Sequence, residues 1–219
     1  MTRKALVASI ADDIEALNQT PVRRVAIDGV DGAGKTHFAD ELATELRCRN
    51  TPVIRASVDG FHQPRHIRHQ RGRNSPEGFY RDSYDYESLI ALLLNPLSPG
   101  GNGEYVSRVY DVEADQPVKK SPHQAVPGAV LVFDGIFTHR PELRPYWDYS
   151  IWLEVPFTTS IPRAATRGNL NPDPNHPSNH RYTAGQRLYI AECDPQSHAT
   201  IQIDNTNLTH PTTSAFDTT

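Results

Sequence analysis

The chain has 219 residues, of which 37% are hydrophobic and 22% are charged, and its formal net charge at pH 7 is −4. This length and composition are typical of one globular domain that builds its core without disulfides or metals. General nucleic-acid and membrane binders depend on an excess of Lys and Arg. The negative charge therefore excludes both classes of partner and restricts any anion site to a local cluster.

The sequence also predicts where the protein works. It shows no apolar leader segment, and no run approaches the ~18 apolar residues needed to span a bilayer. The two cysteines, Cys48 and Cys193, lack CxxC spacing and are interpreted as reduced structural thiols. We therefore expect a cytoplasmic protein, and the sequence leaves a homo-oligomer open.

The first predicted element is an amphipathic helix over residues 3–19. Leu6, Ile10, Ile14 and Leu17 recur at helical spacing and form one apolar face. We expect this helix to pack beside the first strand as scaffold.

A strand, a glycine-rich loop and a helix follow. Residues 22–28 contain an apolar strand core, and Phe38, Leu42 and Leu46 mark one helical face. Between them, residues 29–36 read Gly-Val-Asp-Gly-Ala-Gly-Lys-Thr, a full match to the Walker A pattern G-x-x-x-x-G-K-[ST]. A glycine turn without a ligand is the alternative, but the flanking strand and helix favour a nucleotide site.

The chemistry of phosphate binding explains these residue types. Backbone N–H groups must curl around a phosphate, and a Cβ at Gly32 or Gly34 would block that approach. Lys35 would reach the β- and γ-phosphates and Thr36 would ligate Mg²⁺, so we predict ATP and Mg²⁺ as cofactors. The residues predicted to bind the nucleotide are Gly29, Asp31, Gly32, Ala33, Gly34, Lys35, Thr36 and Arg181.

A second strand, over residues 53–58, leads into Asp59. Ligands of α/β folds lie outside the carboxyl ends of parallel strands, so Asp59 is expected at the same edge as the phosphate loop. A carboxylate there can accept the proton of an attacking hydroxyl. The alternative is that Asp59 only caps the following turn.

Residues 63–85 are dense in Arg, His and aromatic residues, including Tyr80. Such density suits a phosphorylated or aromatic ligand, and a solvated basic loop is the equal alternative. His62, His66 and His69 lack companion Cys or carboxylate residues at metal spacing, so we predict no zinc site.

Asp85 begins the next predicted helix, either as its N-cap or facing the site. Residues 104–111 are predicted to be a strand with residues 118–124 as its hairpin partner. The apolar run 129–133 ends in Asp134, a pattern like Walker B that predicts a buried parallel strand and a second Mg²⁺ ligand. Further strands are expected at 149–155 and 199–203.

The rest of the chain suggests a lid. Residues 157–168 read as a helix that carries Arg163 and Arg167, with Pro162 in its first turn if Ser160 is the cap. Residues 169–180 are rich in Pro and Asn and nearly free of apolar residues, so we predict a mobile lid over about 168–183. The predicted domain spans residues 1–208, followed by a disordered tail over 209–219.

Over residues 25–205 the chain resembles the uridine kinase and phosphoribulokinase family of P-loop kinases. Beyond the phosphate loop, the resemblance lies in four segments: residues 58–62 (Val-Asp-Gly-Phe-His), 82–86 (Asp-Ser-Tyr-Asp-Tyr), 109–111 (Val-Tyr-Asp) and 133–135 (Phe-Asp-Gly). The fold implied is a three-layer α/β P-loop sandwich with a mostly parallel sheet of about five strands and a small hairpin and lid insertion.

The resemblance also implies roles for single residues. It implies Asp59 as the base that activates the sugar hydroxyl, Asp85 as a ribose-binding carboxylate and Tyr110 as a ring that stacks on the base. It also implies Arg163 and Arg167 as lid arginines over the ATP phosphates. The predicted catalytic set is Asp59, Lys35, Arg163 and Arg167. In all, the predicted substrate-binding residues are Asp59, His62, Tyr80, Asp85, Tyr110 and Asp115, and the predicted metal ligands are Thr36 and Asp134. Asp115 stands near where uridine-cytidine kinases carry a His that binds the pyrimidine, Asp134 replaces the usual Glu, and the lid lacks an arginine-dense helix.

The sequence therefore predicts an ATP-dependent kinase of a nucleoside 5′-hydroxyl, with uridine or cytidine as the small-molecule partner. One alternative is a kinase whose acceptor already carries a phosphate or carboxylate, as the arginines of 65–81 suggest. Another is a regulatory nucleotide-binding ATPase, which would need no acceptor carboxylates such as Asp59 and Asp85.

Overall fold

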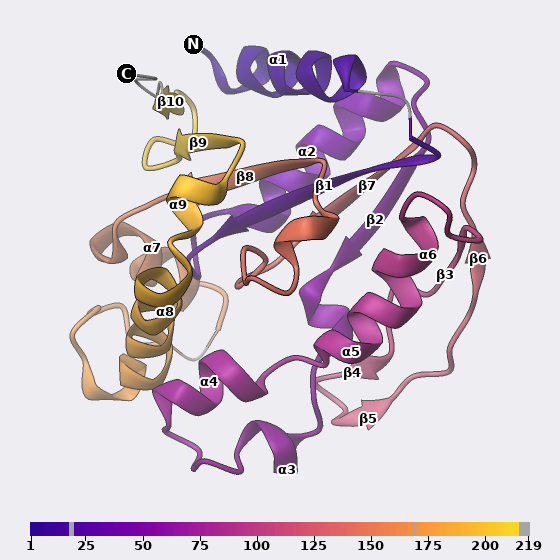
Figure 1. Ribbon diagram of the computed structural model, residues 1–219. Helices are drawn as coiled ribbons and strands as arrows, with labels where there is room; N and C mark the ends of the chain where they lie inside the picture. The colour runs from indigo at the N-terminus through magenta and orange to yellow at the C-terminus, as the bar shows by residue number, and fades with distance from the viewer. Residues whose placement is uncertain (18–19, 169, 215–219) are drawn as a thin grey trace.

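The computed structural model describes residues 1–17, 20–168 and 170–214 (Figure 1). Its centre is a six-stranded sheet with the order β10-β9-β8-β1-β7-β2, in which only β10 is antiparallel to its neighbour. These strands are β1 (Val22–Gly29), β2 (Val53–Ser57), β7 (Ala129–Asp134), β8 (Tyr149–Glu154), β9 (Ile201–Asp204) and β10 (Thr212–Ser214). The predicted α/β fold with a mostly parallel central sheet is confirmed.

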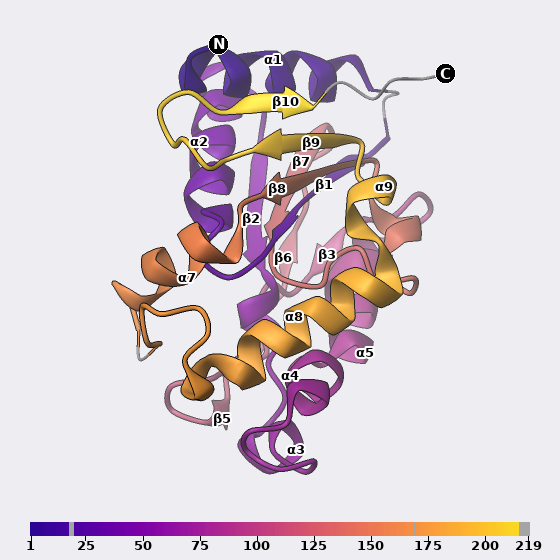
Figure 2. The ribbon, with the colours of Figure 1, turned by 90° about the vertical axis from the view of Figure 1, so that its left-hand side faces the viewer.

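Helices cover both faces of the sheet (Figure 2). On one side α1 (Arg3–Ala16) packs on α2 (Lys35–Cys48), which in turn contacts β1, β2 and β7. On the other side lies α8 (His180–Cys193), packed on α4 (Pro76–Asp82). The remaining helical segments are η1 (Val58–Phe61), α3 (Arg65–Arg68), α5 (Tyr86–Leu89), η2 (Ile90–Leu94), α6 (Asn95–Leu97), η3 (Arg144–Tyr146), α7 (Phe157–Ala165), η4 (Pro177–Asn179) and α9 (Pro195–His198).

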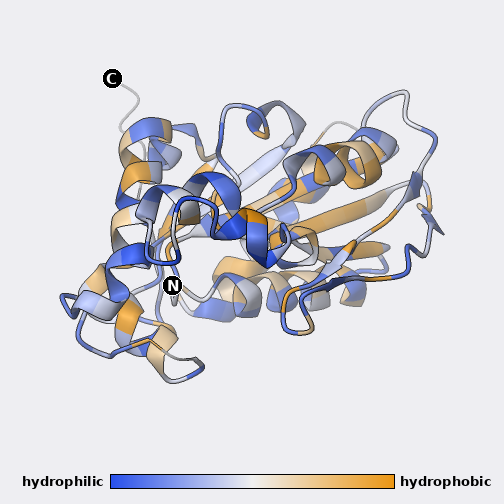
Figure 3. Cartoon of the chain, turned by 90° about the horizontal axis from the view of Figure 1, so that it is seen from below, coloured by the Kyte–Doolittle hydropathy of each residue, from blue (hydrophilic) through white to orange (hydrophobic). Residues whose placement is uncertain are grey.

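The core lies between these layers. All six residues of β7 are buried, because its neighbours β1 and β2 continue the sheet on both sides and helices cover both faces. Figure 3 shows the same arrangement as apolar strands enclosed by helices of mixed polarity. Within the described residues, no helix has both the length and the apolar character to cross a bilayer.

Two predicted segments differ from the structure. The expected hairpin is two small ribbons: β3 (Glu104–Tyr105) pairs with β6 (His123–Gln124), and β4 (Tyr110–Asp111) pairs with β5 (Gln116–Pro117). The tail expected to be disordered contributes β10, because Thr212–Ser214 complete the edge of the sheet beside β9. The final residues, 215–219, lie outside the described part of the chain.

The lid region also differs in part. Helix α7 begins at Phe157 after Pro156, so Pro162 lies inside the helix instead of in its first turn. The segment after Asn169, which itself lies outside the described residues, is tied to buried Asn179: the Asn179 side-chain amide donates to the carbonyls of Asn171 and Asp173. Residues 180–183 belong to α8. The mobility of this segment stays a prediction.

The ion pair between Arg24 and Asp148 gives a test of the fold. The Arg24 side chain is only 7% exposed, and its Nη2 and Nε donate to the two Asp148 carboxylate oxygens at 2.8 and 3.0 Å. Asp148→Ala should lower the free energy of unfolding in urea by about 3–5 kcal/mol, because it leaves a buried charge unpaired. The control Asp12→Ala removes a carboxylate that is 71% exposed and should cost ~1 kcal/mol or less. An equal decrease in the free energy of unfolding in both variants would show that the Arg24–Asp148 pair does not stabilise the fold more than a surface pair does.

Candidate active site

The phosphate loop joins β1 to α2 in a conformation that needs glycine. Gly32 has φ +77° and Gly34 has φ +94°, both in the left-handed region that favours glycine. A Cβ on Gly32 would lie 1.9 Å from the Ser160 carbonyl oxygen, and one on Gly34 would lie 3.0 Å from Asn205 Nδ2. Both glycines are therefore required by the backbone conformation of the loop and by its close packing on α7 and Asn205.

The side chains of Lys35 and Thr36 contact groups at the carboxyl edge of the sheet. Lys35 Nζ donates to the carbonyls of Gly29 and Val30 at 2.9 and 3.0 Å, so its ammonium lies over the phosphate loop. The Thr36 hydroxyl donates to Asp134 Oδ2 at 2.7 Å. Arg55 Nη1 donates to the other Asp134 oxygen at 2.8 Å. Strand β7 thus brings a carboxylate to the first turn of α2, as the sequence pattern predicts.

The donor set at Thr36 and Asp134 fits Mg²⁺. A hydroxyl and a carboxylate oxygen are hard ligands, and Mg²⁺ takes few protein ligands together with waters and substrate phosphates. Across residues 1–17, 20–168 and 170–214 no group of three or more His, Cys, Asp or Glu could hold a metal by itself. The site therefore suits a cation shared with a phosphate rather than a closed protein cage.

Asp31 in the middle of the loop is tied to α8. Its backbone N–H donates to Gln186 Oε1 at 2.7 Å, and Gln186 Nε2 donates to the Asp31 carboxylate at 3.2 Å. Burial raises the pKa of Asp31, against the attraction of the Lys35 ammonium. Gln186 is itself buried, so it fixes the loop from the opposite layer.

Three cavities lie side by side around the loop, and each takes its name from the ligand that is proposed for it below. The phosphate cavity, of about 160 Å³, is lined by the loop with Asp59, Tyr84, Asp134 and Arg167. The nucleoside cleft, of about 480 Å³, shares Gly32, Gly34 and Arg167 with it. The acceptor cleft, of about 810 Å³, shares Ser57 and Asp59 with it. Asp59 therefore stands where the phosphate cavity meets the acceptor cleft.

Asp59 is exposed at the end of β2 and is held by its neighbours. The Tyr84 hydroxyl donates to Asp59 Oδ1 at 3.4 Å, and the Ser57 hydroxyl accepts from the Asp59 N–H at 3.3 Å. His62 Nδ1 lies 3.0 Å from the Asp59 carbonyl, and its ring centroid lies 4.6 Å from that of Tyr84. Burial lowers the pKa of His62. The carboxylate is thus oriented but still reachable from the acceptor cleft.

The acceptor cleft carries paired cations and an excess of carboxylates. Arg55 is paired with Asp40 and Asp134, and Arg108 is paired with Asp111 at 2.9 Å. The acidic residues of the lining are Asp59, Asp111 and Glu113. Both arginines of the lining are therefore already paired with protein carboxylates.

Tyr80 and Arg181 are buried and line none of the three cavities. Tyr80 is buried in the core, where its hydroxyl lies 3.1 Å from Cys193 Sγ and its ring packs on Phe137, so it does not line the acceptor cleft. Arg181 is also buried, and its guanidinium donates to the Arg73 carbonyl at 2.7 Å, so it does not line the phosphate cavity. Proximity along the chain to a basic or lid segment therefore does not fix the direction in which a side chain points.

Three further predicted substrate residues make contacts within the protein. Asp85 caps α5 by accepting from the Ser88 N–H at 2.9 Å. Asp115 Oδ1 accepts from the Tyr110 hydroxyl at 3.2 Å, from Arg68 Nη2 at 3.1 Å and from the Arg65 N–H at 3.0 Å. Tyr110 is buried, and none of Asp85, Tyr110 and Asp115 lines the acceptor cleft. These contacts join the β4–β5 ribbon to α3.

The two predicted lid arginines, Arg163 and Arg167, differ in the cavities that they line. Arg163 lines the nucleoside cleft and donates to the carbonyls of Asn205 and Thr206 at 3.1 and 2.5 Å, which holds the loop after β9. Arg167 lines both the phosphate cavity and the nucleoside cleft. Only Arg167 therefore lies where a cation can face a polyphosphate chain.

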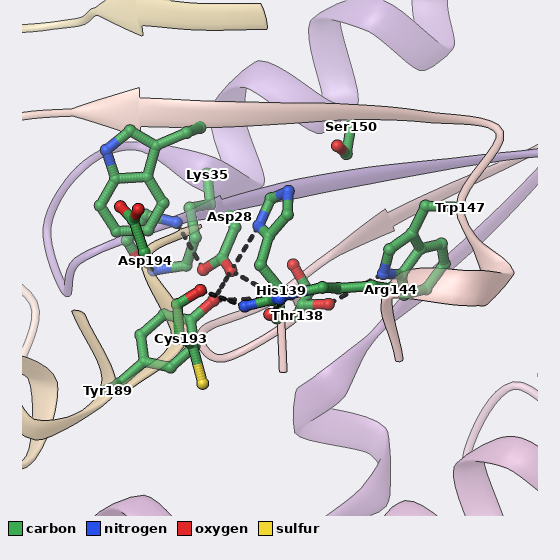
Figure 4. Close-up of polar contacts among 12 residues, drawn as sticks. Asp28, Lys35, Thr138, His139, Arg144, Trp147, Ser150, Tyr189, Cys193 and Asp194 are labelled. Atoms are coloured by element: carbon green, nitrogen blue, oxygen red, sulfur yellow. Dashed lines mark hydrogen bonds and ion pairs between the residues drawn. The ribbon is translucent and has the colours of Figure 1, made fainter. Parts of the chain in front are cut away.

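A buried carboxylate supports the loop from below (Figure 4). Asp28, the residue before Gly29, is fully buried; it accepts from the Gly29 N–H at 2.7 Å and lies 2.9 Å from His139 Nδ1. The Tyr189 hydroxyl of α8 donates to the same carboxylate at 2.5 Å. Burial alone would raise the pKa of Asp28, but the contacts with His139, Tyr189 and Gly29 outweigh it and lower the pKa.

Sequence reasoning missed this group and several others. Asp28, His139 and Tyr189 come from three distant segments, and no local pattern joins them. Tyr84 lies inside a segment that the family resemblance singles out, so that resemblance was the available signal for it. Nothing in the sequence pattern marked Gln186 or Ser57.

No known protein-family profile matches the chain. A protein from Bacillus stearothermophilus described as a possible uridine kinase has the same fold, with TM-score 0.72 and 20% identity over 91% of this chain and 97% of that one. A protein from a Silicibacter species described as a fructose transport system kinase has TM-score 0.68 and 22% identity, over 87% of this chain and 95% of that one. Phosphoribulokinase from Rhodobacter spheroides has TM-score 0.60 and 11% identity, over 84% of this chain and 70% of that one. The chain therefore shares the P-loop kinase fold of these proteins.

The Asp28 group predicts how stability depends on pH. A carboxyl with a lowered pKa contributes stability that is present above its unfolded pKa, near 3.8, and is lost as pH falls through the still lower folded pKa. Tyr189→Phe removes one donor, so it should cost about 1–3 kcal/mol at pH 7 and move acid unfolding to higher pH. Urea unfolding between pH 3 and 7 measures both effects.

The matched control for this prediction is Tyr146→Phe, which removes a hydroxyl bonded to Asn95 in an exposed contact. We expect little change in that variant. Identical acid unfolding of Tyr189→Phe and the parent would contradict the role given to the Tyr189 hydroxyl.

Proposed function

We propose that this protein is an ATP-dependent kinase that transfers the γ-phosphoryl group of ATP to a hydroxyl of a small molecule. The observation that carries this proposal is the position of Asp59, on the wall shared by the phosphate cavity and the acceptor cleft. A nucleotide switch needs the phosphate loop, but it needs no carboxylate at the mouth of a second cleft. The kinase fold of the similar structures supports the same conclusion.

The residues of the phosphate cavity divide the chemistry between them. The loop N–H groups, Lys35 and Arg167 would hold the polyphosphate and oppose the charge of the transferred group. Bound between Thr36, Asp134 and the phosphates, Mg²⁺ would supply further charge neutralisation. Asp59 would accept the proton of the acceptor hydroxyl as its oxygen bonds to the γ-phosphorus and the bond from phosphorus to ADP breaks.

The charges of the acceptor cleft favour a neutral acceptor. Arg55 and Arg108 are paired with protein carboxylates, and Asp59 and Glu113 add further negative charge to the lining. A second phosphate or a carboxylate on the acceptor would face these carboxylates without an uncommitted cation in the lining. A nucleoside has hydroxyls and no charge on the sugar, so uridine or cytidine remains the finer proposal that the sequence resemblance supports.

The arginines of residues 65–81, which suggested a charged acceptor, are largely engaged by protein groups. Arg65 and Arg68 contact Asp115, Arg71 pairs with Asp82, and Arg81 pairs with Glu77 and Glu192. Because Asp115 is already bound to Arg68 and Tyr110, it also has less capacity to bind a pyrimidine. Closure of the predicted lid, over about residues 168–183, on the nucleotide stays part of the proposal.

A screen for ADP release tests the acceptor class. The purified protein is incubated with ATP and Mg²⁺ and with nucleosides, nucleoside monophosphates, pentose phosphates or pantothenate. Turnover with nucleosides alone supports the proposal. Turnover only with the phosphorylated or carboxylate compounds would replace the neutral acceptor by a charged one, and ATP hydrolysis independent of every acceptor would favour a regulatory ATPase.

Asp59→Asn tests the proposed base. The amide keeps the shape of the side chain but cannot take the proton, so kcat should fall by roughly 10²-fold or more while the KM for ATP changes little. The control Glu104→Gln alters an exposed carboxylate on β3, outside all three cavities, and should retain the parent kcat. Unchanged kcat in Asp59→Asn with a raised acceptor KM would make Asp59 a binding residue.

A further inference from the structure

The nucleoside cleft includes a residue from the N-terminal helix. Its lining consists of Arg3, Gly32, Gly34, His37, Glu41, Arg163, Thr166, Arg167 and Leu208. Figure 2 shows the start of α1 above α2, with α7 below it on the same side of the molecule. The helix that the sequence suggested was scaffold therefore reaches the outer wall of this cleft through Arg3.

The Arg3 guanidinium is held in one place by contacts with α2 and with Asn205, and the Arg3 backbone is held by residue 209. Nε pairs with Glu41 at 2.5 Å, and Nη1 donates to Asn205 Oδ1 at 2.8 Å. The guanidinium carbon lies 5.2 Å from the centroid of the Phe38 ring, and the Arg3 N–H donates to the Thr209 carbonyl at 3.1 Å. The side chain is only 15% exposed and is already ordered by these contacts, so binding a ligand would cost it little further conformational entropy.

Asn205 joins this arginine to the phosphate loop. It is fully buried, and its Nδ2 donates to the Ala33 carbonyl at 2.7 Å while its Oδ1 accepts from Arg3. Leu208, from the same connection, is 46% exposed at the cleft. Part of the wall of the nucleoside cleft is thus formed by α1 and residues 205–208 together.

We propose that Arg3 is a nucleotide-binding residue that contacts the nucleoside portion of the triphosphate. The contacts with Glu41 and Asn205 use Nε and Nη1, whereas a guanidinium has five N–H donors and a flat face. The remaining donors suit ribose hydroxyls, and the face suits a heteroaromatic base. Because the nucleoside cleft and the phosphate cavity share Gly32, Gly34 and Arg167, a triphosphate at Lys35 would extend its nucleoside toward Arg3.

This inference rests on the proposed nucleotide site. Titration with two ligands tests the nucleotide site and the Arg3 contact separately. ATP occupies both cavities, whereas inorganic tripolyphosphate offers phosphates without a nucleoside. Calorimetric titration of each ligand, with Mg²⁺ present, is compared for the parent, Arg3→Ala, Arg3→Lys and the control Lys4→Ala. Lys4 is the neighbouring cation on α1 and lines the groove against α2 but not the nucleoside cleft.

Arg3→Ala should weaken ATP binding about tenfold and leave tripolyphosphate binding within about twofold of the parent. Arg3→Lys keeps the charge but loses the planar fork, so ATP binding should weaken in it too while the fold is retained. Lys4→Ala should bind both ligands as the parent does. A thermal melt of each variant confirms that the protein is folded.

Three outcomes would overturn one claim or the other. Unchanged ATP affinity in both Arg3 variants would remove Arg3 from the nucleotide site. Equal loss for ATP and tripolyphosphate would place its effect on the phosphate loop, through Asn205, and contradict a nucleoside contact. A parent protein that binds neither ligand would refute the proposed nucleotide site itself.

Discussion

The buried carboxylate of Asp28 is the constraint on which the phosphate loop depends. An ionised group with no solvent contact costs several kcal/mol unless donors surround it. Here the donors come from the Gly29 N–H, from His139 after β7 and from Tyr189 of α8. The requirement to satisfy one charge therefore joins the end of β1 to the layer on the other side of the sheet.

The same three segments carry groups of the active site. The chain leaves β1 to form the phosphate loop, β7 ends in Asp134, and α8 presents Gln186 to the Asp31 amide. Trp147 and Arg144 donate to the carbonyls of Thr138 and His139, so the segment that carries His139 is itself held in place. Pre-organisation of the loop is thus distributed over buried polar contacts rather than being a property of the eight-residue motif alone.

The row of three cavities follows from parallel strand order. Strands β1, β7 and β2 are neighbours and run in the same direction, so Gly29, Asp134 and Ser57 reach one edge of the sheet. Asp59 follows β2 directly and meets the phosphate cavity there. On the other side of β1, strands β8 and β9 lead into α7 and residues 205–208, which line the nucleoside cleft. The phosphate loop therefore lies between the sites proposed for the two substrates.

The sequence by itself determined the elements whose information is local. The phosphate loop, the apolar run that ends in Asp134 and the strand before Asp59 are each contained in fewer than about ten residues, and the period of apolar residues predicted the strands and helices around them. The pairing of β3 with β6 falls within the predicted hairpin strands, but the second ribbon β4–β5 and the edge strand β10 were not predicted, because short ribbons and an edge strand depend on distant partners, as β10 depends on β9.

Only the tertiary structure decided which side chains face the cavities. Tyr80 and Tyr84 lie four positions apart, yet Tyr80 packs in the core against Phe137 and Tyr84 contacts Asp59. Arg181 is turned toward backbone carbonyls of residues 68–75, whereas Arg3, at the far end of the chain, reaches the nucleoside cleft. Asp28 meets His139 across 111 positions and Tyr189 across 161. Such contacts arise because packing and charge satisfaction act through space, and one sequence read along its length carries no measure of that distance.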